Sequence, residues 1–223
     1  MLTTGQITIE PKGMPKLLAE ALESSVIFGE LPPGARVIEE EIAARYRVSR
    51  SPVREAFRQL ETDGLLIRED RKGVRVTGVS RRNLDEVYMC RIELESIAIR
   101  EASIRWKPPA LDHFGRYLRE MERAFKANDL KAYFVANVAF TEATHRAADN
   151  QTLRRLLNGI GKQALRYRYL AYQAFPHLIG VSIEGNRDLV KHIAVRDGDK
   201  AAKVMRELIE HSWRTVRSCV TDE

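Results

Sequence analysis

Twelve consecutive residues, Ser49–Leu60, constrain the fold of this chain more than any other stretch. Ser51 has the side chain of a helix N-cap, and Pro52 suits the first helical position, where a missing N–H group costs nothing. After Pro52 the apolar residues recur at i, i+3, i+4 and i+7, the spacing of one helix face; they are Val53, Ala56, Phe57 and Leu60. The stretch therefore predicts a short amphipathic helix.

Basic side chains flank the apolar stripe of this predicted helix. Arg54 and Arg58 fall beside the stripe, and Arg50 stands at the N-terminal end. Two serines, Ser49 and Ser51, accompany Arg50 there. Hydroxyls and free N–H groups at a helix N-terminus bind phosphate, and arginine can fork onto the edge of a guanine. The pattern therefore suits a DNA major groove, although an ordinary amphipathic helix with a solvated basic flank would look the same.

The sequence on either side of the basic helix favours the DNA interpretation. Before it, the pattern predicts a helix over 15–28, a short strand over 36–38 and a second helix over 39–46. After it, two β-like runs at 65–68 and 74–77 predict a hairpin with a basic tip. Helix, turn, helix and hairpin in this order predict a winged helix–turn–helix domain over residues 15–77.

Four segments of this block carry a resemblance to a known family: Gly29–Gly34, Glu39–Ala43, Val48–Glu61 and Asp63–Leu65. They read Gly-Glu-Leu-Pro-Pro-Gly, Glu-Glu-Glu-Ile-Ala, Val-Ser-Arg-Ser-Pro-Val-Arg-Glu-Ala-Phe-Arg-Gln-Leu-Glu and Asp-Gly-Leu. Together they resemble the DNA-binding domain of the GntR family of bacterial transcription regulators. The resemblance is nearly continuous over residues 15–77, and it implies that the basic helix contacts operator DNA with help from the wing.

Nine residues are the candidate DNA contacts. By the resemblance, the chief ones are Ser49, Arg50, Ser51 and Arg54. The basic flank and the wing tip add Arg45, Arg58, Arg71, Lys72 and Gly73. The family usually has a glycine where this chain has Arg71, so we expect a differently shaped wing tip or an extra cation directed at the minor groove or a phosphate.

Beyond residue 79 the sequence predicts helices only. They cover 83–105, 110–127, 128–148, 150–173, 186–197 and 199–217, with a loop region at 175–185. Asn128 and Asn150 are the predicted N-caps of the third and fourth helices, and Ser80 can cap the first. Residues 80–223 thus predict an all-α antiparallel bundle of six or seven helices, which resembles the FCD ligand-sensing domain of the FadR subclass. Residues 1–14 are expected to form a flexible arm.

Three helices of this predicted bundle carry polar residues on their apolar faces. Arg91 and Glu95 interrupt the first stripe. Asn137 and Thr141 interrupt another, and Asn186 lies on a third. A buried polar group costs about 1–3 kcal/mol unless it is hydrogen-bonded. The pattern favours a shared ligand pocket formed by Arg91, Asn137, Thr141 and Asn186. Alternatively, Arg91 and Glu95, which lie one helical turn apart, pair with each other and close the core, so that no pocket forms.

The resemblance also implies a place for a metal, because many FCD domains hold a divalent ion through one aspartate and three histidines. Those four places fall here on Asn137, Thr141, Asn186 and Leu208. A register shifted by two residues brings Asp188 and Glu210 to the final places, again without a histidine. Zinc and other transition metals prefer imidazole, thiolate or carboxylate ligands. We therefore expect no metal and no other cofactor.

Composition and motifs argue against several other classes of protein. The chain has 223 residues, of which 44% are apolar and 30% charged, enough for two domains with real cores. It has no signal-peptide pattern and no apolar run near the about 18 residues of a membrane span. Cys90 and Cys219 fit two reduced thiols in a cytoplasmic protein. P-loop, GxSxG, HExxH and GxGxxG motifs are absent from the sequence, so we do not expect an enzyme.

The distribution of charge does not by itself locate a DNA site. The net charge of +6 suits a nucleic-acid partner. However, residues 1–79 carry 12 basic and 12 acidic side chains, whereas residues 80–223 carry 25 and 19. Local segregation is more informative, because the segment 45–58 holds five arginines and a single acid.

These patterns together predict a cytoplasmic, homodimeric, sequence-specific DNA-binding regulator that binds no membrane. Two-fold symmetry calls for a palindromic double-stranded operator, because each winged domain reads one half-site. We expect a repressor that a small organic-acid or acyl effector releases from DNA. Two alternatives stay open: a DNA-binding regulator whose pocket has decayed and senses nothing, and a helical protein-interaction module.

Overall fold

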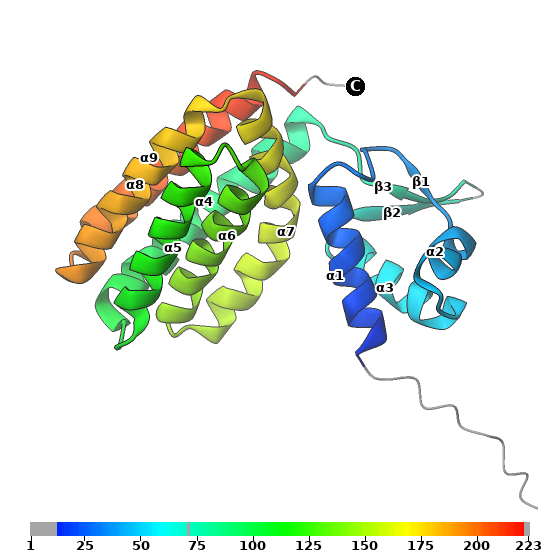
Figure 1. Cartoon of the computed structure of the whole chain (residues 1–223), viewed down its shortest axis with the longest axis horizontal. Coiled ribbons are helices and arrows are strands. Elements are labelled where there is room, and N and C mark those ends of the chain that lie inside the picture. Colours follow the sequence, from blue (N-terminus) through cyan, green and yellow to red (C-terminus); the bar gives the residue numbers. More distant parts are fainter. Residues whose placement is uncertain (1–12, 71, 221–223) are drawn as a thin grey trace, which may run out of the picture. The chain divides into compact units, whose positions relative to one another are not determined.

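The computed structural model describes residues 13–70 and 72–220 (Figure 1). Within it the chain forms two compact units, residues 1–78 and 79–223. The first contains short helices and a small sheet, and the second contains helices only. Residues 1–12 of the predicted arm lie outside the described residues. The structure confirms the predicted fold class, which is mainly α with a small β-hairpin wing.

The first unit has three helices and three short strands among its described residues. The helices are α1 (Met14–Ile27), α2 (Glu39–Tyr46) and α3 (Arg50–Thr62). The strands are β1 (Arg36–Val37), β2 (Leu66–Glu69) and β3 (Gly73–Val76), in the antiparallel order β1-β3-β2. In the hairpin, Leu66 pairs with Val76 and Glu69 with Gly73, so β2 and β3 form the predicted wing.

The basic helix, α3, packs the predicted apolar face into the core of this unit. Its four apolar residues are completely buried: Val53, Ala56, Phe57 and Leu60. The predicted start of the helix was wrong, however. Ser49 is the N-cap, with extended backbone angles, and the helix begins at Arg50. Arg50 and Ser51 therefore belong to the first turn, which brings the Arg50 side chain onto the helix itself.

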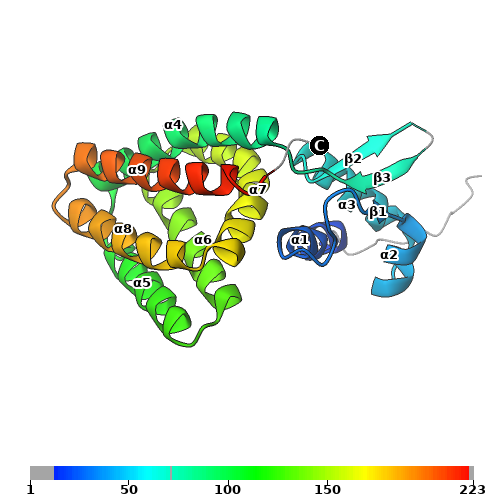
Figure 2. The same cartoon turned by 90° about the horizontal axis from the view of Figure 1, so that it is seen from above.

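The second unit consists, within residues 79–220, of six helices (Figures 1 and 2). They are α4 (Arg81–Arg105), α5 (Ala110–Lys126), α6 (Leu130–Ala147), α7 (Gln151–Ala174), α8 (His177–Ala194) and α9 (Gly198–Arg217). Figure 2 shows α4 and α9 running side by side, and these two helices share the most extensive contact of the unit. α7 contacts both helices of this pair, whereas α6 contacts α4.

Side-chain N-caps fix the starts of four of these helices. The predicted caps Ser80 and Asn150 are confirmed, because each side chain accepts a hydrogen bond from a backbone N–H three residues on. Asn128 was wrong as a cap. It takes a left-handed backbone, with φ of 53°, and Asp129 caps α6 instead. Asp197 caps α9 in the same way.

The predicted loop at 175–185 was also wrong, because α8 begins at His177 and continues without a break to Ala194. Two glycines, Gly180 and Gly185, made this segment resemble a loop in the sequence. Both lie inside the helix, and Gly185 allows a close approach of α9. Asn186 consequently lies in the middle of α8 and not at the start of a helix.

Candidate functional site

The exposed face of α3 carries the predicted DNA-contacting side chains. Ser49, Arg50, Ser51, Arg54 and Arg58 are all exposed, at the N-terminus and on the part of the helix outside its buried stripe. This face presents three guanidinium groups and two hydroxyls around one helix N-terminus. Such a surface can bind phosphate and reach base edges.

Two of these arginines are oriented by acids at the start of α2. Arg54 donates from Nε to Oε2 of Glu39 at 2.7 Å. Nη1 of Arg50 lies 2.8 Å from Oε1 of Glu40. The Arg54 pair leaves both Nη groups of that guanidinium available for a partner, whereas the Arg50 pair uses one of them. Sequence analysis missed both pairs, because the partners are separated by at least ten positions and meet only through the turn between α2 and α3.

The remaining candidate DNA contacts lie at α2 and the wing. Arg45 is exposed and its guanidinium lies 5.7 Å from the centroid of the Tyr46 ring. Lys72 is exposed, with its Nζ 3.6 Å from Glu69. Gly73 opens β3 with φ of 85°, a backbone conformation that strongly favours glycine. Arg71 lies outside the described residues.

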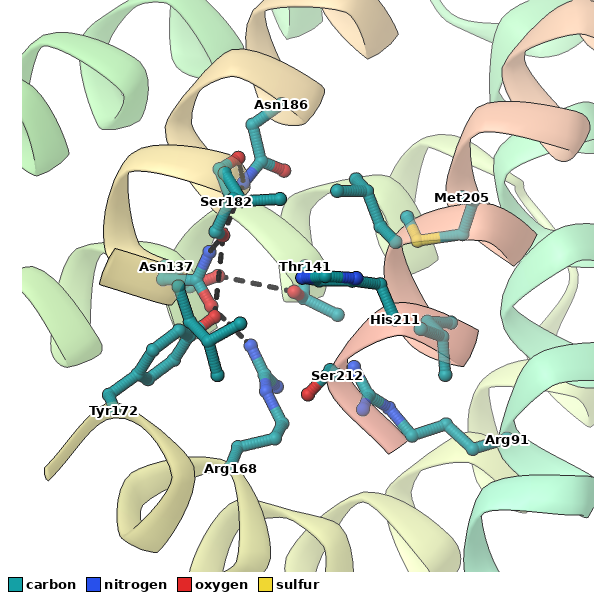
Figure 3. A pocket seen from close by; sticks show the side chains of 14 residues that line it. Arg91, Asn137, Thr141, Arg168, Tyr172, Ser182, Asn186, Met205, His211 and Ser212 are labelled. Carbon is teal, nitrogen blue, oxygen red and sulfur yellow. Dashed lines mark hydrogen bonds between the residues drawn. The ribbon is translucent and has the colours of Figure 1, made fainter. Parts of the chain in front are cut away.

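The four predicted pocket residues, Arg91, Asn137, Thr141 and Asn186, line a single cavity in the second unit (Figure 3). Three of them are buried, and Thr141 is half-buried. The volume of the cavity is about 60 Å³. Since a cavity needs about 10–15 Å³ to hold one water, this volume holds roughly four to six waters or a small organic molecule.

Five further polar residues of the cavity were missed from the sequence. They are Arg168 and Tyr172 on α7, Ser182 on α8, and His211 and Ser212 on α9. A signal for Arg168 was present, because it falls on the stripe of α7 that includes Ala164 and Ala171. The alternation of arginine and tyrosine around it concealed the inward face. His211 is exposed and therefore lies at the rim.

A hydrogen-bond network links the polar side chains at one end of the cavity. Arg168 donates to Oδ1 of Asn137, and Nδ2 of Asn137 lies 3.3 Å from Oγ of Ser182. Asn186 donates to the Ser182 carbonyl oxygen at 2.8 Å, and the Tyr172 hydroxyl is 3.3 Å from Ser182 Oγ. Ser182 therefore connects three of the residues, from α6, α7 and α8, that surround this end (Figure 3).

Arg91 lies at the other end of the cavity and also takes part in a buried ion-pair cluster. Its Nε is 3.7 Å from Glu95, and Glu95 lies 2.8 Å from Nε2 of His145. Burial alone would raise the pKa of Glu95, but His145, Arg91 and Arg168 together hold it below its usual value. The predicted Arg91–Glu95 pair thus exists, and Arg91 still faces the cavity.

The electrostatic character of the cavity is cationic. Arg91 and Arg168 are each more than nine-tenths buried, and within the described parts of the chain no carboxylate lines the cavity. Burial, followed by the nearby charge of Arg91, lowers the pKa of Arg168. An arginine nevertheless stays protonated in a protein. Glu95, which is not part of the lining, pairs with Arg91, so two buried guanidinium groups share one nearby carboxylate. This excess of positive charge favours an anionic ligand.

The side chains at the four family metal places do not fit a transition metal. Asn137, Thr141, Asn186 and Leu208 all border the cavity, so these places do converge. They offer two amides, a hydroxyl and an alkyl group, which are poor ligands for such an ion. Among the residues that the structure describes, there is no group of three His, Cys, Asp or Glu side chains that could hold a metal.

Leu208 packs directly against the backbone of Gly185. A Cβ atom at Gly185 would lie 2.4 Å from Cδ2 of Leu208. Gly185→Ala should therefore displace Leu208 toward the cavity and lower the free energy of unfolding by about 1–3 kcal/mol, measured by urea denaturation. Gly180→Ala on the same helix meets nothing within 4 Å and should instead raise it by about 0.5–1 kcal/mol. Equal stabilities of the two variants would contradict this packing.

Comparison with known proteins matches both units. Residues 16–76 match the family model described as bacterial regulatory proteins, gntR family, and residues 86–211 match the FCD domain. The probable D-xylose utilization operon transcriptional repressor of Paenarthrobacter nicotinovorans is 33% identical over 184 residues, 82% of this chain and 76% of that protein. The chain belongs to the GntR family.

Further relatives agree with this GntR assignment. The gluconate operon transcriptional repressor of Bacillus subtilis (strain 168) is 29% identical over 64% of this chain and 58% of its own length. The structure of McbR/YncC from E. coli shares the fold, with a TM-score of 0.83 and 22% identity over 92% of this chain and 98% of that one. This GntR protein is a DNA-binding transcriptional regulator, and neither its family nor its relatives are enzymes.

Within the described ranges, no helix of the GntR chain is both long enough and apolar enough to cross a bilayer.

Proposed function

We propose that this regulator is a homodimeric, cytoplasmic repressor that a small organic acid releases from a palindromic operator. The observation that carries the proposal is the cavity between α4, α6, α7, α8 and α9, which is lined by two buried arginines and, within the described residues, by no carboxylate. Glu95, outside the lining, pairs with Arg91 alone of these two arginines, and a buried charge is costly unless an opposite charge compensates it. The names of the two relatives, both operon repressors, support repression.

The proposed DNA contacts are the exposed residues of α3, supported by Arg45 and the wing. Arg54 and Arg58 would enter the major groove, while Ser49, Arg50 and Ser51 bind phosphate near the helix N-terminus. Lys72 and Gly73 at the wing would contact the backbone or the minor groove, and we place Arg71 with them from the sequence. Two copies related by a two-fold axis would read two matching half-sites.

The size of the cavity narrows the proposed effector. Room for roughly four to six waters fits an acid of three or four carbons. A long acyl chain does not fit without displacement of the apolar side chains that border the cavity, among them Leu178, Met205 and Ile209. A short organic acid is therefore favoured over an acyl compound, with Arg91, Asn137, Thr141 and Asn186 as direct contacts.

Effector binding would act on DNA by a shift between dimer geometries. The effector must bind one geometry more tightly than the other, because a ligand with equal affinity for both shifts nothing. Five helices of the second unit meet at the cavity, so a ligand there can change how they pack against one another. The geometry favoured by the ligand would then no longer match the spacing of the operator half-sites.

Fluorescence anisotropy on duplex DNA from upstream of its own gene tests the proposal. The full chain is titrated onto this DNA with excess competitor, at two salt concentrations, and then with a panel of short organic and acyl acids. We expect specific binding that one short acid weakens. Specific binding that no acid affects would overturn the effector and favour a decayed pocket. Binding without preference over competitor DNA would overturn the proposal that the protein recognises a specific operator.

A further inference from the structure

We propose that Arg168 takes the place of a metal cation in this cavity, so that the site holds an acidic effector through a guanidinium built into the chain. The inference rests on the proposed function, since it assumes an acidic effector. It goes further in assigning the anchor to a residue on α7, a helix that contributes none of the four metal places.

The first observation is the position of the Arg168 guanidinium. It extends from α7 into the end of the cavity where Asn137 and Asn186 meet around Ser182 (Figure 3). There it donates a hydrogen bond to Oδ1 of Asn137. By the resemblance to the FCD domain, Asn137 stands at the place where a metal-binding member would present a carboxylate to its ion. A positive group therefore already lies against the first metal place.

The second observation is the charge around Arg168. Within the described parts of the chain Arg168 forms no salt bridge, and its guanidinium donates to a neutral amide. The charges of Arg91 and Glu95 act on it with opposite signs, and Glu95 already pairs with Arg91 and His145. Its guanidinium lies 5.8 Å from the centroid of the Phe134 ring, an apolar neighbour. A second cation placed beside Asn137 would be repelled at short range in a poorly screened interior. The same charge attracts a carboxylate, whose two oxygens match the guanidinium fork.

The third observation is the fourth metal place, Leu208. Its alkyl side chain is pressed against the backbone of Gly185, where it leaves no room for a Cβ atom. The position therefore contributes shape and apolar surface, and no ligand atom. An amide beside a fixed cation, together with an alkyl side chain in the wall, describes a site for a small carboxylate with a short carbon chain.

Zinc titration of rebuilt sites tests the proposal without DNA or effector. In a full-length fourfold variant the four metal places are restored by Asn137→Asp, Thr141→His, Asn186→His and Leu208→His. A second protein carries the same changes with Arg168→Met, which keeps an unbranched, flexible side chain and removes the guanidinium and its charge. Calorimetry with Zn²⁺ alone should give one ion per chain in both, bound on the order of tenfold or more tightly in the protein without Arg168.

Three outcomes would overturn the proposal. The rebuilt site could bind zinc equally well with and without Arg168, or fail to bind it even without Arg168. The wild type could bind one zinc per chain that Asn137→Ala abolishes. Should circular dichroism show the fourfold variant unfolded, the pair Thr141→His with Asn186→His, with and without Arg168→Met, gives the same comparison with Ni²⁺.

The acid that releases the operator, once found by anisotropy, supplies a second test. Chelator should leave its effect unchanged, and Arg168→Met should raise the concentration needed for release at least about tenfold, as expected for loss of a charged hydrogen bond. Loss of release on chelation would overturn the proposal while leaving the repressor function intact. Failure to find any such acid would count against the effector, whereas the zinc result would still decide the place of Arg168.

Discussion

The variant Arg54→Ala is expected to bind operator DNA on the order of ten- to a hundredfold more weakly than the wild type. Glu39 holds Nε of Arg54 at 2.7 Å, so the two Nη groups form a preoriented fork. A fork of this kind fits O6 and N7 of a guanine. We therefore expect the variant to lose preference at one base position in each half-site, and not only affinity.

Arg50→Ala should differ in character, although its affinity also falls. The Arg50 guanidinium spends one Nη group on Glu40 and must give up that pair to fork onto a base. We expect Arg50 to contact a DNA phosphate. Arg50→Ala should therefore weaken binding to all DNA sequences, and the slope of log K against log salt concentration should fall by about one. Anisotropy at several salt concentrations, on the operator and on single-base variants, measures both effects.

Arg82→Ala is the matched control for these variants. Arg82 is exposed on α4, pairs only with Glu86 within its own helix, and carries the same charge outside α3. Its removal should leave the operator affinity nearly unchanged. If Arg54→Ala or Arg50→Ala bound the operator as tightly as Arg82→Ala does, α3 would not be the recognition helix.

Glu95→Gln is expected to lower the free energy of unfolding by about 3 kcal/mol or more. Glu95 is 3% exposed and is the carboxylate that faces both Arg91 and His145. Removal of its charge leaves a buried guanidinium without its counter-ion. Urea denaturation followed by circular dichroism measures the loss. Glu93 lies on the same helix as Glu95 and forms an exposed ion pair with Arg206 of α9. Glu93→Gln should therefore barely change the urea midpoint.

The Glu95 carboxylate makes the free energy of unfolding depend on pH, with a defined sign. The pKa of Glu95 in the folded chain lies below its ordinary value of 4.5. Its contribution to stability is therefore present above pH about 4.5 and is lost as the pH falls through the lower, folded value. Urea midpoints measured between pH 6 and pH 3, roughly, should fall more steeply for the wild type than for Glu95→Gln. Parallel curves would show that Glu95 does not dominate the acid response.

The predictable part of this fold is the part governed by local pattern. The stripe of α3 and the hairpin after it follow from residue spacing, because one buried face suffices to define each of them. The errors occurred where local and tertiary signals disagree. Ser51 and Ser49 are both acceptable N-caps by residue type, and the local sequence does not decide between them; in the fold the N-cap position falls on Ser49. Gly180 and Gly185 suggested a loop, whereas Gly185 serves the contact with Leu208.

The cavity shows the same division. Arg91, Asn137 and Asn186 were found because a polar residue on an apolar stripe is visible in a single helix. Arg168 was missed, since its helix alternates basic and aromatic residues and no single face stands out. The partners of Arg50 and Arg54 were missed for another reason: Glu39 and Glu40 suit the N-terminus of α2 by themselves, and nothing local shows that they also reach α3.

The acids at the start of α2 have a consequence for how such a regulator searches a chromosome. Two cations of α3 carry their own counter-ions, so contact with random sequence releases fewer ions from DNA than the number of arginines suggests. The affinity for the vast excess of non-operator sites is thereby lowered. At the operator, hydrogen bonds to a matching base edge can compensate for the loss of the ion pairs with the glutamates. We expect residence on random DNA to be brief, and the time to reach an operator to be correspondingly short.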